Sequence, residues 1–534
     1  MVNSIKNYLK TNYLLLILLF IAFYLRFAYP TPVCWHPDSV KYLVPLAIIQ
    51  SGNFDWILST INFSLLSKVI NYIVQINNNG DPSGVIVYQK FIAVISTLLF
   101  YLIALRVSAK NKLWSFIFTL IFTMNPLMLF FEQTIMPESL FIFWALLLSF
   151  LFIKFTEKEN YPYAICFALT LGLMTYTKDS SLLYSTLIFL ALIIWSGLKF
   201  FKTKNLKPIL LTSLIILITL ATKLPMQIYN QNKFGEFTFN KFYTNGVLLW
   251  FLSEEMLLEN PSDKHKWLTY YILMANQACR EKYKVPLGQT SRIAFECAIT
   301  EVNVAARENH LVNPFTGVPV TQEYWNEITP EYYKDTLFRN PKRSWEAFLY
   351  NANIMLFKNN FYFYPYRKSD RPGTQYEGVI FTQAPFALNK MVDPLLQNCK
   401  VITTENMDEH NIYTDASRNQ IIQGYIPFMV NRDTNQAFLY PEKGLSLWLQ
   451  SNCRTLPWMR IILPVFLSAV FFFLGRIDRW AKNPDFLIVL YLLGSALLFL
   501  LLPSIIHGEA RYQLQFTHYM LLFILAAFFR SRPN

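Results

Sequence analysis

About ten apolar stretches dominate this chain, and each approaches the roughly 20 residues that a helix needs to cross a bilayer core. They cover residues 13–29, 85–105, 113–131, 138–155, 161–177, 181–198 and 208–224, and then 458–474, 486–506 and 514–529. Hydrophobic residues make up 54% of the chain and charged residues 15%. This is too apolar for a soluble domain, and an aromatic content of 17% excludes a disordered chain. The sequence therefore predicts an α-helical polytopic membrane protein.

Basic residues gather in every other short loop between these stretches. Lys6 precedes the first span, Lys110 follows the second, Lys158 follows the fourth and Arg476 follows the eighth. Because Lys and Arg are retained on the cytoplasmic side, the alternation predicts an even number of spans with both termini in the cytoplasm. The same retention accounts for the net charge of +13, so we expect membrane lipids and no nucleic acid among the partners. A basic site for an anionic lipid is compatible with this interpretation.

Two long extracytoplasmic segments divide the chain into regions. Residues 1–224 form an N-terminal transmembrane module with a first loop at 30–84, in which 40–50 and 57–74 are amphipathic. Residues 225–457 are long enough for a domain, predicted to be helical at 254–282, 291–309 and 331–358 and loop-rich later. Residues 458–534 hold the C-terminal transmembrane helices. The composition near 341–357 suits a helix that rests on the membrane surface.

Cysteines are concentrated outside the predicted spans, at Cys34, Cys279, Cys297, Cys399 and Cys453. In an oxidising compartment, Cys279–Cys297 and Cys399–Cys453 are conceivable disulfides. The connectivity cannot be read from the sequence, and the odd number leaves one thiol free.

Ionisable residues are scarce in the span centres and gather at their extracytoplasmic ends. They are Asp38, Lys90, Glu132, Glu138, Lys178, Asp179, Lys223, His507, Glu509 and Arg511. Charged side chains are costly inside a bilayer, so residues at one depth from distant loops favour a polar chamber at the outer leaflet. The alternative is that each is an ordinary interfacial residue that snorkels or is solvated.

Five short motifs resemble those of the GT-C glycosyltransferases, which use polyprenyl-phosphate sugars and include protein O-mannosyltransferases and the aminoarabinose transferase of lipid A. The first is His-Pro-Asp-Ser-Val-Lys-Tyr-Leu at 36–43. The second runs from Asn-Pro-Leu at 125–127 to Met-Pro-Glu-Ser-Leu-Phe at 136–141, and the third runs from Leu-Gly-Leu to Thr-Lys over 171–178. The fourth, over 229–246, contains Tyr-Asn, Phe-Gly-Glu-Phe and Asn-Gly. The fifth is Gly-Glu-Ala-Arg-Tyr at 508–512. Two positions depart from the family: Ser39 stands where a second acid often follows, and Tyr229 stands where the family has arginine.

The resemblance implies a GT-C-like bundle with a large extracytoplasmic domain between the seventh and eighth spans. It implies an enzyme of the bacterial inner (plasma) membrane that moves a hexosyl or pentosyl group from a polyprenyl-phosphate donor. The acceptor would be a hydroxyl or phosphate on a glycan, lipid or protein. The sequence leaves the sugar and the acceptor open.

Glycosyl transfer needs a base near the acceptor and positive charge near the departing phosphate. We expect Asp38 to be the general base, although an Asp at this place can also cap a helix that starts near Ser39. Arg511 is the expected phosphate ligand, because its planar guanidinium can hold two phosphate oxygens.

Four further residues are candidates for the same site. Lys178, Lys90 and His507 are expected to bind the donor phosphate, but each is also typical of an interfacial or solvated position. Glu138 is expected to orient the acceptor, or else to favour the start of its own helix. The sequence establishes no cofactor. A divalent metal ion is compatible with Asp38 and Glu138, yet two carboxylates without fixed spacing do not define a site.

Two other functions compete with glycosyl transfer from a lipid phosphate. A transporter or flippase for lipid-linked glycans should carry polar groups near the midplane and repeated halves, and we find neither. An oligosaccharide ligase would use a lipid-pyrophosphate donor. The sequence has neither a D-x-D pair nor a G-x-G-x-x-G run, so a nucleotide-sugar donor is disfavoured.

Overall fold

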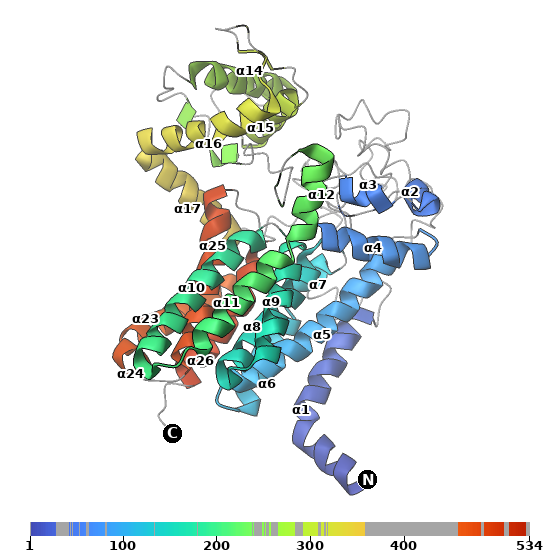
Figure 1. Ribbon diagram of the computed structural model, residues 1–534, viewed down its shortest axis with the longest axis vertical. Helices are drawn as coiled ribbons and strands as arrows, with labels where there is room; N and C mark the ends of the chain where they lie inside the picture. Colours follow the sequence, from blue (N-terminus) through green and yellow to red (C-terminus); the bar gives the residue numbers. More distant parts are fainter. Residues whose placement is uncertain are drawn as a thin grey trace, which may run out of the picture. The chain divides into compact units, whose positions relative to one another are not determined.

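The computed structural model of this chain is built from α-helices (Figure 1). It describes residues 2–27, 42–59, 64–235, 237–239, 248–257, 265–282, 292–307, 311–357, 458–481, 485–506 and 512–529, with short gaps inside several of these ranges. Two compact units divide the chain. The first comprises Met1–Phe242, Phe361–Leu497 and Leu514–Asn534, and the second comprises Tyr243–Asn360 and Leu498–Gln513.

The first unit contains most of the apolar helices. They are α1 (Val2–Phe27), α5 (Ser83–Val107), α6 (Lys112–Thr123), α8 (Glu138–Lys158), α9 (Tyr161–Thr175), α10 (Ser180–Thr203), α11 (Lys207–Ala221), α23 (Trp458–Leu474), α25 (Phe486–Ile506, which continues into the second unit) and α26 (Gln513–Phe529). Helix α5 packs against α1, α6 and α8, and α9 packs against α8, α10 and α11. Short helices α7 (Pro126–Phe131), α12 (Leu224–Phe234) and α24 (Ile477–Ala481) complete this part.

The described helices confirm an α-helical membrane protein. Four are long and apolar enough to cross a bilayer, at Gly84–Val107, Glu138–Lys158, Tyr184–Thr203 and Lys207–Lys233. Six shorter apolar helices lie at Tyr13–Phe27, Lys112–Thr123, Tyr161–Thr175, Met459–Leu474, Phe486–Leu501 and Gln513–Phe529. Apolar side chains on their outer faces are exposed, as expected where lipid replaces water; Phe20 is 69% exposed and Leu217 is 65% exposed.

Two predicted span boundaries were wrong. The stretch 113–131 is not one helix, because α6 ends at Thr123 and α7 begins at Pro126. Asn125 starts α7, since its side-chain oxygen accepts hydrogen bonds from the backbone N–H groups of Leu127 and Met128. At the other boundary, the span predicted to end at 224 is followed directly by α12, which ends at Phe234 before Gly235, whose φ of 76° suits glycine.

Helix α26 is the most buried helix of the first unit, with almost every side chain from Leu514 to Ala527 inside. A group of hydroxyls beside it joins three other helices. The Tyr184 hydroxyl lies 2.8 Å from that of Tyr491, 3.0 Å from that of Tyr519 and 2.9 Å from Oγ of Ser495. The Tyr491 hydroxyl in turn lies 3.1 Å from Oγ of Ser149. Tyr184 is therefore the centre of a polar cluster that ties α8, α10, α25 and α26 together.

Replacing Tyr184 with Phe should destabilise the bundle by about 1–3 kcal/mol, because buried hydroxyls would lose their shared partner. Detergent-denaturant unfolding of the purified chain would measure the loss. Tyr161→Phe, at an exposed position of α9, is the matched control and should change little. If both variants lose the same free energy of unfolding, the hydrogen bonds of the Tyr184 hydroxyl add nothing to stability.

The first loop holds three short helices, α2 (Leu46–Ser51), α3 (Phe54–Ser59) and α4 (Leu65–Asn77). In α4 the polar face points inward and the apolar face points outward. Its polar residues Lys68, Asn71 and Gln75 are buried, whereas Ile73 and Ile76 are exposed. A helix with its polar face inward and its apolar face outward is suited to an apolar surrounding.

The second unit contains α14 (Lys266–Lys282), α15 (Arg292–Arg307), α16 (Gln322–Arg339) and α17 (Pro341–Phe357). Helix α14 packs against α15, and α16 packs against both α15 and α17. The single helix predicted at 331–358 was wrong. Helix α16 begins earlier, where Thr321 caps it by accepting a hydrogen bond from the N–H of Tyr324, and a new helix starts at Pro341.

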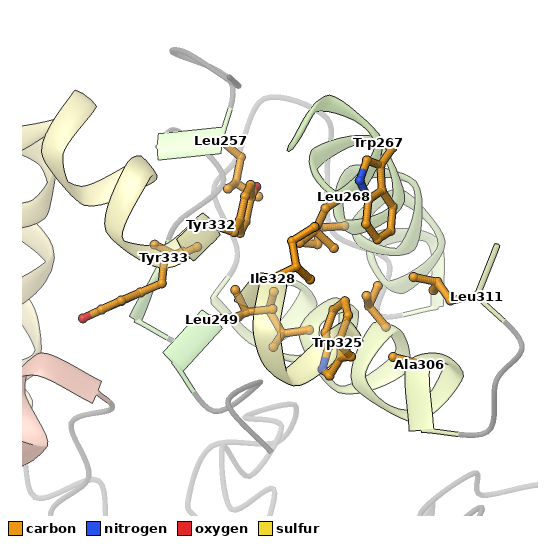
Figure 2. Packing of buried hydrophobic residues seen from close by; sticks show 14 of the residues in the cluster. Leu249, Leu257, Trp267, Leu268, Ala306, Leu311, Trp325, Ile328, Tyr332 and Tyr333 are labelled. Atoms are coloured by element: carbon orange, nitrogen blue, oxygen red, sulfur yellow. The ribbon is translucent and has the colours of Figure 1, made fainter. Parts of the chain in front are cut away.

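An apolar core holds the second unit together (Figure 2). Trp325 and Ile328 of α16 point into the same interior as Trp267 and Leu268 of α14, and Ala306 of α15 lines one side. Cys279 and Cys297 form a disulfide between α14 and α15, which confirms one of the two conceivable pairings. Cys34, Cys399 and Cys453 lie outside the described residues, and Cys166 is a free, exposed thiol.

Candidate functional site

Charged side chains occupy both ends of the helical bundle in the first unit, but in different surroundings. At one end, which we call the Glu157 end, Arg106 pairs with Glu157 and lies 3.5 Å from Asp485. These side chains are 19–34% exposed. At the opposite end, which we call the Glu132 end, the paired charges are 1–12% exposed. Exposed pairs need no special explanation, whereas buried charges in a membrane bundle indicate a functional site.

Arg26 and Glu132 form the most buried ion pair of the described residues. Nη2 of Arg26 lies 2.6 Å from Oε1 of Glu132, and each side chain is 1% exposed. Arg26 is in the last turn of α1, and Glu132 follows α7, so the pair joins segments far apart in the chain. Burial raises the pKa of Glu132, while the charges of Arg26 and Lys90 act in the opposite direction.

Gln89 and Lys90 of α5 also lie beside Glu132. The Gln89 amide nitrogen donates to the backbone oxygens of Glu132, at 3.1 Å, and Thr134, at 2.7 Å. Lys90 is 6% exposed, and its ammonium lies 5.7 Å from the centre of the Phe27 ring. The negative face of the ring favours the ammonium, and the charge of Lys90 also acts on Glu132.

Glu138 and Lys178 form a second ion pair at the Glu132 end. Glu138 is the first residue of α8, and Lys178 lies between α9 and α10. Nζ of Lys178 lies 2.9 Å from Oε1 of Glu138, with the side chains 12% and 2% exposed, respectively. Among the described residues, no group donates a hydrogen bond to Oε2 of Glu138. The structure thus brings together two residues that the sequence predicted separately.

Polar residues of α4 hold the chain just after the predicted base. The side chain of Asn71 donates to the backbone oxygen of Tyr42 at 2.6 Å. Oε1 of Gln75 accepts from the N–H of Val44 at 3.2 Å. Tyr42 and Val44 are buried, so the segment that follows Asp38 is attached to a helix.

Three predicted site residues, Asp38, His507 and Arg511, lie outside the described residues, as do Asp179 and Glu509. Their roles remain predictions. Lys223 is described and buried between α11 and α12, and no ion pair joins it to another described residue.

Arg26, Gln89, Asn71 and Gln75 were not among the predicted site residues. Only Arg26 has a visible signal, because it is the one charged residue of the apolar segment 13–29. Amides carry no charge, so nothing in the sequence separates these three from surface amides. Among the described residues, no group of three or more His, Cys, Asp and Glu is placed to hold a metal ion.

Comparison with known proteins adds no assignment: no family model, curated protein or solved structure matches the chain.

Loss of the Lys178 charge is expected to cost about 2 kcal/mol of stability, because Lys178→Met leaves both oxygens of Glu138 without a donor. The start of α8 offsets part of the loss, since its dipole favours a carboxylate. Thermal unfolding in detergent would measure the change. Lys154→Met at the Glu157 end is the control and should cost about 1 kcal/mol or less. If Lys178→Met leaves the unfolding temperature unchanged, solvent takes the place of the Lys178 ammonium beside Glu138.

Proposed function

We propose that this chain is an integral-membrane glycosyltransferase that moves a sugar from a polyprenyl-phosphate donor to an acceptor hydroxyl or phosphate. The observation that carries the proposal is the burial of Arg26, Lys90, Glu132 and Glu138 at one end of an apolar bundle, with Lys178 paired to Glu138 and only 12% exposed. Phosphate departure needs cations in a place of low dielectric constant, and acceptor activation needs a carboxylate nearby. The Glu132 end contains both kinds of group.

In this proposal, the ten apolar helices are ten spans and the Glu132 end faces the extracytoplasmic side. Support comes from the basic loops at the Glu157 end, since Lys110, Lys112 and Lys158 follow or precede helices there. Residues 225–457 then lie between the seventh and eighth spans, in the bacterial inner (plasma) membrane that the resemblance implies.

The roles within the site follow from charge and position. Asp38 takes the acceptor proton, and Arg511 binds the departing phosphate with help from Lys90 and His507. Lys178 adds positive charge while Glu138 holds its ammonium, so Glu138 acts as a positioning residue for the cation. Asn71 and Gln75 hold Tyr42 and Val44, which follow Asp38 closely in the sequence.

Transfer assays with the purified chain in phospholipid vesicles would test this function. Radiolabelled polyprenyl-phosphate sugars are the donors, and envelope lipid, glycan and protein extracts are the acceptors. The proposal predicts label on an acceptor and free polyprenyl phosphate. Label that moves only from a nucleotide sugar or a lipid pyrophosphate would refute the donor class. A lipid-linked glycan that crosses the bilayer with its glycosidic bond intact would identify a transporter instead.

A further inference from the structure

Helix α17 exposes an apolar and cationic face in the second unit. Trp345 is 59% exposed and Leu349 is 48% exposed. Lys342 precedes them by three and seven residues, so all three side chains share one face of the helix. Trp345 is also stacked on Phe348, with ring centres 5.2 Å apart, which holds the indole in place. An exposed Trp and Leu beside a Lys is the composition of a helix at a membrane interface.

The same helix packs against an apolar segment of its own unit. The side chain of Asn351, 2% exposed, donates to the backbone oxygen of Ser504 at 3.2 Å. Ser504 belongs to residues 498–506, the end of α25, which read Leu-Phe-Leu-Leu-Leu-Pro-Ser-Ile-Ile and contain no charge. Figure 1 shows α17 beside this end of α25. Helix α17 therefore contacts an uncharged, apolar run of a kind that is suited to a bilayer.

The exposed residues lie close along α17 to its contact with α25. Trp345 is six residues from Asn351, or about 9 Å along the helix axis, and Leu349 is nearer. Trp side chains concentrate in the headgroup layer of a bilayer. An exposed Trp that faced water alone would leave a large apolar surface uncovered.

Charge on the face favours a lipid phosphate. Arg343 is paired with Glu346 at 3.0 Å, and Arg339 is paired with Asp335 at 2.7 Å. Within the described part of the chain, Lys342 has no carboxylate partner. Its ammonium, one turn from Trp345, is therefore the cation of this face that an anionic ligand would meet first.

We propose that α17 docks the second unit onto the membrane, with Trp345 and Leu349 in the headgroup layer and Lys342 on a phospholipid phosphate. This inference is independent of glycosyl transfer, because it uses none of the residues at the Glu132 end.

Photo-crosslinking of the full chain in vesicles would test the docking. The photoreactive amino acid benzoylphenylalanine replaces Trp345 in one preparation and Tyr270 in another; Tyr270 is 54% exposed on α14 of the same unit. Vesicles contain phosphatidylcholine alone or with added phosphatidylglycerol, and mass spectrometry identifies the adducts. We expect lipid adducts at position 345 and few at position 270.

Two variants of the position-345 probe separate the contributions of the face. Leu349→Ser should lower the yield of lipid adducts in both kinds of vesicle. Lys342→Ala should lower the docking equilibrium about fivefold where phosphatidylglycerol is present and less where it is absent. Lipid adducts as frequent at 270 as at 345 would overturn the proposal. So would adducts at 345 with a second copy of the chain instead of lipid.

Discussion

Replacing Arg26 with Met is expected to destabilise the protein by about 3–5 kcal/mol, because it leaves the buried carboxylate of Glu132 without its cation. Both side chains are 1% exposed, so the carboxylate has little access to solvent. Reversible unfolding in mixed detergent micelles would measure the loss. Arg106→Met, which removes a half-exposed arginine at the Glu157 end, should cost about 1 kcal/mol or less.

Acidification should restore part of the stability of Arg26→Met. Burial raises the pKa of Glu132, and Arg26 opposes this shift, so the variant should have a still higher pKa. A carboxyl with a higher pKa in the folded than in the unfolded state loses stability as pH rises between the two values. The deficit should therefore be largest at alkaline pH and shrink as acid protonates Glu132.

Neutralising both members of the pair provides the control for this interpretation. Arg26→Met with Glu132→Gln removes the unpaired charge and should recover most of the loss, with little dependence on pH. If the double variant is as unstable as Arg26→Met alone, the arginine acts through packing and not through charge.

Replacing Asp38 with Asn is expected to lower kcat/KM for sugar transfer by about 10²–10⁴-fold, because an amide cannot take the acceptor proton. Asn caps a helix about as well as Asp, so this substitution separates the two interpretations of Asp38. A capping role alone would leave transfer within a few fold of the unchanged chain. The rate of transfer from a radiolabelled polyprenyl-phosphate sugar, measured at several donor concentrations, gives kcat/KM.

Asp485→Asn is the matched control for Asp38→Asn. Asp485 lies 3.5 Å from Arg106 at the Glu157 end, away from the buried charges. Its loss should leave kcat/KM unchanged. A similar fall in both variants would point to a general loss of folded protein and would contradict a specific role for Asp38.

The membrane character and the helix positions could be predicted because hydropathy acts over about 20 residues and needs no knowledge of neighbours. Boundaries were less predictable. Asn125 and Pro126 interrupt an apolar stretch that reads as one span, and Pro341 divides a predicted outer helix, because capping groups act over two or three residues.

Glu132, Glu138, Lys178 and Lys90 were predictable as a set, since charges are costly in apolar helices and stand out in the sequence. Their pairing depended on the tertiary structure. Arg26 meets Glu132 and Lys178 meets Glu138 only because α1, α5, α8 and α9 pack side by side. The Tyr184 cluster and the inward polar face of α4 have the same origin. Hydropathy depends on each residue alone, whereas a buried hydrogen bond depends on which two helices are neighbours.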